Sequence, residues 1–569
     1  MTGTGDEAHR SPPPRAPGRT CSVRVILLLG ALLILAGPPA RAQGGDPIAL
    51  AKKLGHADAK ERIKAAQALA KLGEKALPAL AALAAVLVDP DAGVRKAACV
   101  ALRAIGGRAA GLGRTLLDAL VDPDAGVRTE AAQSAGAIAA KGANLTPSAI
   151  EALERAGDPR RLEEARALLD FRERAVGLLP ARLRDPEAAV RRATARALES
   201  LAASARPAAS DLRDGLRDSD AETRSTCARA LAAVGGGSPE TFSALADGLD
   251  DSEAAVRRAC AEALGRFGGP AREAVPALAD ALDDSDREVR AQALFALSRM
   301  GRDAAPAVPD VMRLLEDPDP ATRIRAAETL GAAGGGASAV LSVLTRACRD
   351  PHEGVRTAAV TALGAAGAKT ALVTSDVLDL LEDPAPGVRA AAVGVLARLG
   401  PIGDLTLSRL VDVLEDDPDD GVFTEAARTV ARLGARAGPA VAALTQAARC
   451  DRPRRRIEAC VALEKVYPAL TPVVVKSVCE CLEAETPAVR SLAVDALGRM
   501  KREPATVVPA LAKRLADRDA GVRLAAAQNL ARFGREASAA RGDLEDALRD
   551  ADPRVAAAAR DALERIDGR

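Results

Sequence analysis

Residues 89–106 read DPDAGVRKAACVALRAIG, and the first seven letters return unchanged at residues 122–128. A close variant, DRDAGVR, stands at residues 517–523. A phrase that repeats an acid, a turn and an arginine could bind a ligand many times over, supply catalytic carboxylates, or join the units of a repeat protein. The spacing of the arginine along the chain decides between these three.

The arginine of this phrase defines a register that runs through the chain. Successive positions recur at a nearly constant spacing, except for one shorter step between Arg161 and Arg191. Such a fixed period is typical of repeat proteins, in which each unit buries its apolar face only against its neighbours. The register positions are Arg62, Arg95, Arg128, Arg161, Arg191, Arg224, Arg257, Arg290, Arg323, Arg356, Arg389, Phe423, Arg456, Arg490, Arg523 and Ala556.

Each unit is predicted to form two helices. An aspartate four residues before the arginine, such as Asp91, can cap the second helix, and apolar residues then recur at helical spacing. A glycine eleven residues after the arginine, such as Gly106, is placed to end the helix in a left-handed conformation. The apolar stretch before the aspartate forms the first helix. We therefore expect an all-α fold, an α-α superhelix of about sixteen two-helix units with a period of about 33 residues.

The composition agrees with closely stacked helices. Aromatic residues make up 1 % of the chain, with no tryptophan, one tyrosine and six phenylalanines, so small side chains must fill the core. The formal net charge is +1, which gives no attraction to a polyanion. We expect no nucleic-acid partner.

Residues 1–42 differ from the rest of the chain. Four arginines precede the apolar run VILLLGALLILA at residues 25–36, and Ala40-Arg41-Ala42 follows. This order is that of a secretory signal peptide, and the run is shorter than the roughly 20 residues of a membrane span. We predict a signal peptide at residues 1–42 and a repeat solenoid at residues 43–569, exported to the periplasm or the extracellular space. An uncleaved membrane anchor is the alternative.

The phrase at residues 89–106 and its echoes resemble the HEAT repeat, and the compact unit looks most like the short form named after phycobilin lyases. The resemblance covers about residues 46–569. It implies a superhelix whose second helices line a concave face, but it does not specify an activity. We expect an exported, non-enzymatic scaffold that binds unidentified protein partners on that face. A phycobilin-lyase-like protein or a hydroxylase-like oxidoreductase is the alternative by family analogy alone.

The recurring arginine lies near the positive end of its helix, where a cation is mildly disfavoured. It therefore needs a carboxylate, and the aspartate in the turn of the next unit is within reach of a long side chain. We predict a structural ladder of alternating aspartate and arginine residues. Its members are Asp89, Arg95, Asp122, Arg128, Asp251, Arg257, Asp284, Arg290, Asp317, Arg323, Asp350, Arg356, Asp383 and Arg389.

The residues that usually carry chemistry are scarce. Beyond residue 42 the only histidines are His56 and His352, both in predicted turns, so neither a histidine-based catalytic site nor a multi-histidine iron site can be built. Cysteines such as Cys99 and Cys227 fall where other units have alanine or another small residue, and are expected to be buried. We predict no catalytic residue, no metal site and no cofactor.

The pattern fails most clearly between residues 417 and 490. Phe423 replaces the arginine, Tyr467 replaces the final glycine, and the basic run DRPRRR at residues 451–456 lies between them. This irregularity indicates either a kink or an interaction patch. The candidate patch consists of Phe423, Arg454, Arg455 and Tyr467. Elsewhere the residue five places after the arginine varies from unit to unit, as expected of a binding surface.

Overall fold

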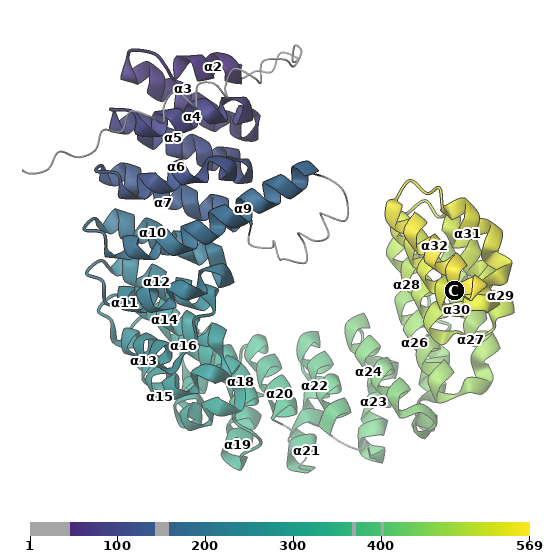
Figure 1. Ribbon diagram of the computed structural model, residues 1–569. Helices are drawn as coiled ribbons and strands as arrows, with labels where there is room; N and C mark the ends of the chain where they lie inside the picture. Colours follow the sequence, from purple (N-terminus) through teal and green to yellow (C-terminus); the bar gives the residue numbers. More distant parts are fainter. Residues whose placement is uncertain (1–45, 143–158, 367–370, 400–402, 569) are drawn as a thin grey trace, which may run out of the picture. The chain divides into compact units, whose positions relative to one another are not determined.

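The computed structural model describes residues 46–142, 159–366, 371–399 and 403–568. Every regular element in these ranges is an α-helix or a 3₁₀ helix, as expected of an all-α repeat protein (Figure 1). The predicted signal peptide lies outside them. None of the helices in these ranges combines the length and the hydropathy that a membrane crossing requires. The chain divides into two compact units, Met1–Ala277 and Leu278–Arg569.

The second helix of each repeat is regular, and α5 (Ala92–Ile105), with 14 residues, is representative of the set. Within each unit these helices stack in the order in which they are connected. The first unit also contains α3 (Ala59–Leu72), α7 (Ala125–Ala140), α10 (Ala188–Leu201), α12 (Ala221–Val234) and α14 (Ala254–Phe267). The second contains α16 (Arg287–Met300), α18 (Pro320–Ala333), α20 (Glu353–Ala365), α22 (Pro386–Leu399), α24 (Asp420–Leu433), α26 (Pro453–Val466), α28 (Pro487–Met500), α30 (Ala520–Phe533) and α32 (Pro553–Asp567).

The first helices are less regular, because in most repeats a short α-helix is flanked by 3₁₀ turns, several of which contain proline. The α-helical parts are α2 (Pro47–Lys53), α4 (Leu80–Ala85), α6 (Gly113–Asp118), α9 (Pro159–Leu178), α11 (Ala209–Asp214), α13 (Pro239–Asp247), α15 (Val275–Asp280), α17 (Val308–Arg313), α19 (Ser338–Ala347), α21 (Ala371–Asp379), α23 (Asp404–Asp416), α25 (Val441–Ala447), α27 (Thr471–Glu480), α29 (Pro504–Ala512) and α31 (Arg541–Ala547).

The ends of the second helices follow from the sequence, with one correction. The Asp91 carboxylate accepts a hydrogen bond from the Val94 N–H and caps α5. The glycine after the helix has a positive φ as expected, but its ψ is not that of the left-handed helix: Gly106 lies at φ 77° and ψ −144°. The chain thereby turns directly into the 3₁₀ segment of the next repeat. Equivalent glycines are Gly73, Gly268, Gly301, Gly434 and Gly534.

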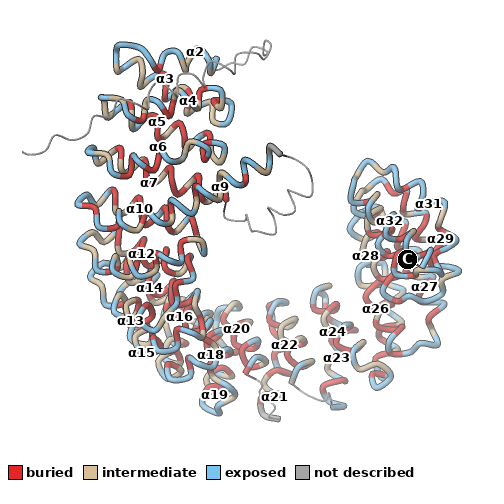
Figure 2. The backbone as a smooth tube through the Cα atoms, in the orientation of Figure 1, coloured by how far each residue is buried: buried red, intermediate tan, exposed pale blue. Residues whose placement is uncertain are grey.

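The core lies between successive helices and is built from small and aliphatic side chains. In α5, the stripe of Val94, Ala98, Leu102 and Ile105 is no more than 1 % exposed. In Figure 2 the buried residues lie where helices contact one another, and exposed residues gather at the turns. Some contacts exclude any side chain: a Cβ added at Gly136 of α7 would lie 2.5 Å from the Ala197 Cα of α10.

One predicted unit departs from the register. The register predicts that Arg161 begins a second helix, but this residue lies in the 20-residue α9, and α7 packs directly against α10. The Arg128 side chain pairs with Asp185, 57 residues further on, so the ladder skips Arg161. The described residues accordingly hold fifteen second helices, none of which starts at Arg161. Residues 143–158 lie outside the described ranges.

Candidate functional site

The joint between two repeats is a fork of hydrogen bonds. Arg95 Nε donates to Asp122 Oδ2 over 2.7 Å, and Arg95 Nη2 donates to Asp122 Oδ1 over 2.8 Å. Arg95 Nη1 donates to the carbonyl oxygens of Asp89 and Pro90 in its own turn. Asp122 Oδ1 also accepts from the Asp124 N–H. One arginine therefore holds its own turn and the next, and both side chains are about one-tenth exposed.

The same fork recurs along the described repeats, with Nε to Oδ2 distances of 2.6–2.8 Å in the pairs named next. The pairs are Arg62–Asp89, Arg95–Asp122, Arg128–Asp185, Arg191–Asp218, Arg224–Asp251, Arg323–Asp350, Arg356–Asp383, Arg389–Asp417, Arg490–Asp517 and Arg523–Asp550. Because an arginine fork and a carboxylate match in a planar, bidentate geometry, each pair fixes both the distance and the orientation of neighbouring repeats.

Burial and pairing act in opposite directions on the aspartates. Burial would raise the pKa of the Asp122 carboxyl, but the hydrogen bonds from Arg95 and from the Asp124 N–H, with the charges of Arg95 and Arg128, hold that pKa below its usual value. Seven further carboxyls of the ladder have a lowered pKa: Asp89, Asp185, Asp251, Asp350, Asp383, Asp517 and Asp550.

Two predicted ladder members are placed differently. Arg290 Nη1 donates to the Asp284 and Ser285 carbonyls of its own turn. Among the described residues, however, no carboxylate forms an ion pair with Arg290, and the Asp317 carboxylate accepts only the Asp319 N–H. The structure thus does not bring Arg290 and Asp317 together. Arg257 Nη1, one repeat earlier, holds the Asp251 carbonyl of its own turn as the other ladder arginines do.

The ladder is interrupted in the irregular region. Phe423 takes the arginine position, and Cys450 takes the matching aspartate position of the next turn. The Arg455 guanidinium lies over the Phe423 ring, 4.6 Å from its centroid. Arg455 also donates to Asp420 Oδ1 over 3.2 Å and to the Asp417 carbonyl over 2.9 Å. Arg455, which belongs to α26, therefore joins the two repeats at the point where the ladder arginine is absent.

The four residues of the candidate interaction patch are not placed alike. Phe423 is 0 % exposed and the Arg455 side chain 12 % exposed, because the two pack against each other inside the joint. Arg454 and Tyr467 are exposed, Tyr467 at 49 %. Phe423 and Arg455 therefore serve the fold of this joint, and only Arg454 and Tyr467 remain available to a partner.

A different surface stays available along the second helices. The side chain five residues after each ladder position is exposed or half-buried in every described second helix. Examples of this set, which we call the variable positions, are Gln67, Gln133, Arg196, Glu262, Phe295 and Glu328. Because these side chains do not fill the core, their identity can change without disturbing the stack. These positions can be located from the repeat period of the sequence alone.

His352 and the buried cysteines have structural roles. His352 caps α20, since its Nδ1 accepts from the Gly354 N–H over 3.1 Å. Burial raises the pKa of the Cys99 thiol to about 12, and the same holds for Cys227, Cys260 and Cys460. These thiols are therefore protonated. Within the described ranges, no three histidine, cysteine or acidic side chains are grouped as metal ligands would be.

The sequence matches the model of a known family over most of its length. HEAT repeats match nine segments, which together span residues 48–112, 175–464 and 475–564. The chain therefore belongs to the HEAT repeat family. The matched segments contain capped helix starts and whole arginine forks such as Arg62–Asp89 and Arg224–Asp251, whereas Asp122 and Arg128 lie outside them.

Two solved structures have a similar fold. A crystal structure of importin beta is 16 % identical over 92 % of this chain and 83 % of its own, with a TM-score of 0.52. The Kap95:Nup1 complex is 11 % identical over 91 % of this chain and 81 % of its own, with a TM-score of 0.51. At these identities the likeness concerns the fold alone. No curated protein matches the sequence.

Proposed function

We propose that this protein is an exported, non-enzymatic scaffold that binds protein partners along its second helices. The observation that carries the proposal is the set of variable positions. They recur once per repeat, they are not buried, and they are not used by the ladder or the caps. An array of such side chains on a rigid stack suits recognition of an extended protein surface.

The importin-like fold supports this proposal at the level of class, because the similar chain in the Kap95:Nup1 structure was solved as a complex. The export part rests on the sequence of residues 1–42.

The binding part is tested by site-specific photocrosslinking of the secreted, tagged protein. A crosslinking amino acid replaces Gln133, Arg196 or Phe295 at variable positions. Matched controls carry it at Val88 or Glu316, which are exposed in first-helix segments. We expect the same partner, identified by mass spectrometry, from several variable positions and not from the controls. The absence of any crosslinked protein, or equal capture by the controls, would contradict the proposal.

The export part is tested on the N-terminus of the protein found outside the cytoplasm. A mature chain that begins at Gln43 supports a cleaved signal peptide. A membrane-bound chain that retains residues 1–42 would instead show an anchor. A chain confined to the cytoplasm would overturn export.

A further inference from the structure

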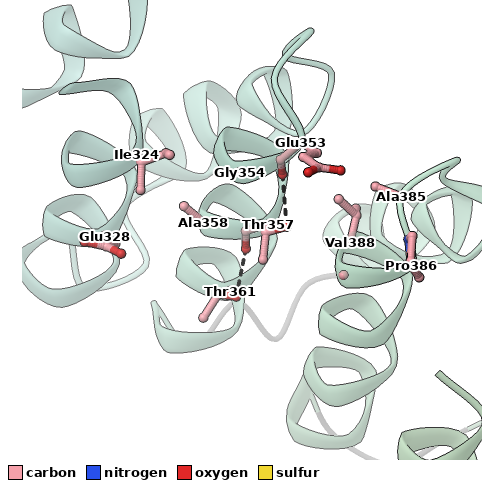
Figure 3. A pocket seen from close by; sticks show the side chains of 11 residues that line it. Ile324, Glu328, Glu353, Gly354, Thr357, Ala358, Thr361, Ala385, Pro386 and Val388 are labelled. Carbon is pink, nitrogen blue, oxygen red and sulfur yellow. Dashed lines mark hydrogen bonds between the residues drawn. The ribbon is translucent and has the colours of Figure 1, made fainter. Parts of the chain in front are cut away.

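Three successive second helices of the second unit, α18, α20 and α22, line a groove of about 530 Å³ (Figure 3). Ile324 and Glu328 come from α18, Thr357 and Thr361 from α20, and Val388 from α22. Glu328 and Thr361 occupy variable positions. The groove is therefore part of the surface to which the proposed function assigns partner binding.

The groove exists because side chains are missing along α22. It begins with Pro386-Gly387, directly after Ala385, and a Cβ built on Gly387 would meet no atom within 4 Å. The same is true of Gly394 further along α22. The Cβ direction at Gly387 therefore opens onto space that no described atom occupies within 4 Å.

The side chains that line the groove offer acceptors and apolar carbon only. Glu328 and Glu353 are exposed, and neither forms an ion pair with any described residue. The Thr357 and Thr361 hydroxyls donate to the carbonyls of Glu353 and Thr357, over 2.9 and 2.8 Å, so that only their lone pairs remain for a ligand.

The arginines nearest to the groove in sequence leave its carboxylates unpaired. Arg323 is held by Asp350, and Arg356 is held by Asp383. Arg325 is exposed, it does not line the groove, and within the described chain it forms no ion pair with a groove carboxylate.

The groove consequently keeps two carboxylates beside the accessible apolar carbon of Ile324 and Pro386, with Ala358 and Val388 buried beneath. A complementary ligand has an aliphatic stem and a positively charged, donor-rich end. This description fits a lysine or arginine side chain, whose carbon stem can pack on apolar surface while its charged end stays at the rim.

We propose that this groove binds an extended segment of a partner protein by a lysine or arginine side chain flanked by small apolar residues. The stem packs on Ile324, whose Cδ1 lies beside Gly354, and the charged end meets Glu353 next to it. Glu328, on α18, adds to the negative charge of the groove. Ala385 has no side-chain oxygen to cap α22, which leaves the Gly387 N–H at the rim able to donate to a main-chain carbonyl of the segment. This inference rests on the proposed function and specifies one of its binding sites.

The test titrates the full-length chain into a fluorescein-labelled heptapeptide whose central lysine lies between two valines. Counterparts with norleucine or glutamate at the centre are measured in parallel by fluorescence anisotropy. We expect the lysine peptide to bind about fivefold to tenfold more tightly than the norleucine peptide, and the glutamate peptide more weakly still. No lysine-dependent binding with the protein at about 1 mM overturns the inference.

Matched variants test whether the peptide binds in the groove. Glu328→Gln/Glu353→Gln should remove the preference for lysine, whereas Glu288→Gln, at an exposed glutamate in the first turn of α16, should keep it. Gly387→Phe should abolish binding by filling the groove. Gly542→Phe, at the corresponding second residue of α31 and equally free of steric contact, should not. Equal effects of the groove variants and their controls would refute the site.

The two proposals can fail separately. If a crosslinked partner persists with Gly387→Phe and the peptide shows no lysine dependence, the scaffold stands and the groove inference falls. If the lysine peptide binds as expected and no variable position captures a partner, the groove stands and the proposed function falls.

Discussion

Arg95 and Asp122 lie in successive repeats, and two parallel hydrogen bonds of 2.7 and 2.8 Å join their side chains. A guanidinium at the start of a helix is mildly unfavourable by itself. The fork makes this placement favourable, because the arginine also neutralises a nearly buried carboxylate and donates hydrogen bonds to two carbonyls of its own turn. Repetition of this relationship makes the stack rigid without a large aromatic core.

We predict that Arg95→Ala destabilises the stack locally by about 2–3 kcal/mol, because it leaves a nearly buried carboxylate unpaired. Hydrogen exchange of the amides in α5 and α7 measures the local opening, and circular dichroism checks that the helices persist. The control is Arg290→Ala, which removes the equivalent side chain from a joint in which the described residues form no ion pair with it. Equal losses in the two variants would show that the carboxylate contributes nothing.

Acid should weaken the same joints. The lowered pKa of Asp122 and its equivalents means that the unfolded chain binds protons more readily than the folded chain. Their contribution to stability is therefore fully present above the unfolded pKa of about 3.9, and it is lost as the pH falls through the lower folded value.

The check is the midpoint of urea unfolding between neutral pH and about pH 3, the range in which the carboxyls begin to be protonated. We expect a decline that begins near pH 5 and steepens below it. Asp122→Asn should be less stable at pH 7 and should lose less on acidification. A midpoint that stays constant down to pH 3 would contradict the assignment.

Much of the fold could be predicted from the arginine register, because it fixes where each second helix begins and ends. Two features could not. Arg161 satisfies the register by chance within a long helix, and only packing shows that Arg128 reaches past it to Asp185. The ψ angle after each helix depends on the 3₁₀ turn that follows.

The irregular residues show the same limit at the site. From the sequence alone, Phe423 could be either a surface anchor or a core residue. The Arg455 guanidinium packed over its ring shows that it is a core residue. The groove at Gly387 could not be predicted from the sequence, because it results from the absence of side chains and no sequence motif marks it.

Ala202 occupies the position that is glycine in ten other units of the register. It adopts the backbone conformation of Gly106 and its equivalents, with φ 47° and ψ −136°. This region strains any residue with a Cβ by about 1–3 kcal/mol. Ala202→Gly should therefore stabilise the protein by about 1–2 kcal/mol, measured as a higher thermal midpoint.

The reverse change provides the control. A Cβ at Gly301 would meet no atom within 4 Å, so any loss in Gly301→Ala reports backbone strain and not a clash. Stabilisation by Gly301→Ala, or destabilisation by Ala202→Gly, would show that these positive φ values are not a constraint.

The interrupted joint allows the ladder to be rebuilt. Phe423→Arg alone should destabilise the protein, because it removes a buried ring and introduces a guanidinium opposite Cys450. Cys450→Asp alone introduces a carboxylate without a fork. The double variant recreates the pair found at the regular joints, and its loss should be smaller than the sum of the single losses by about 1–3 kcal/mol.

The matched control for this rebuilt joint is Phe423→Arg/Ala484→Asp, which places the carboxylate at the partner position of Arg456 instead. Unfolding free energies for the single and double variants of each set measure the coupling. Because a new arginine at 423 can form a fork only with the turn directly after it, the first double variant should show coupling and the second should be additive. Additivity in both would mean that the ladder geometry does not extend through the irregular repeats.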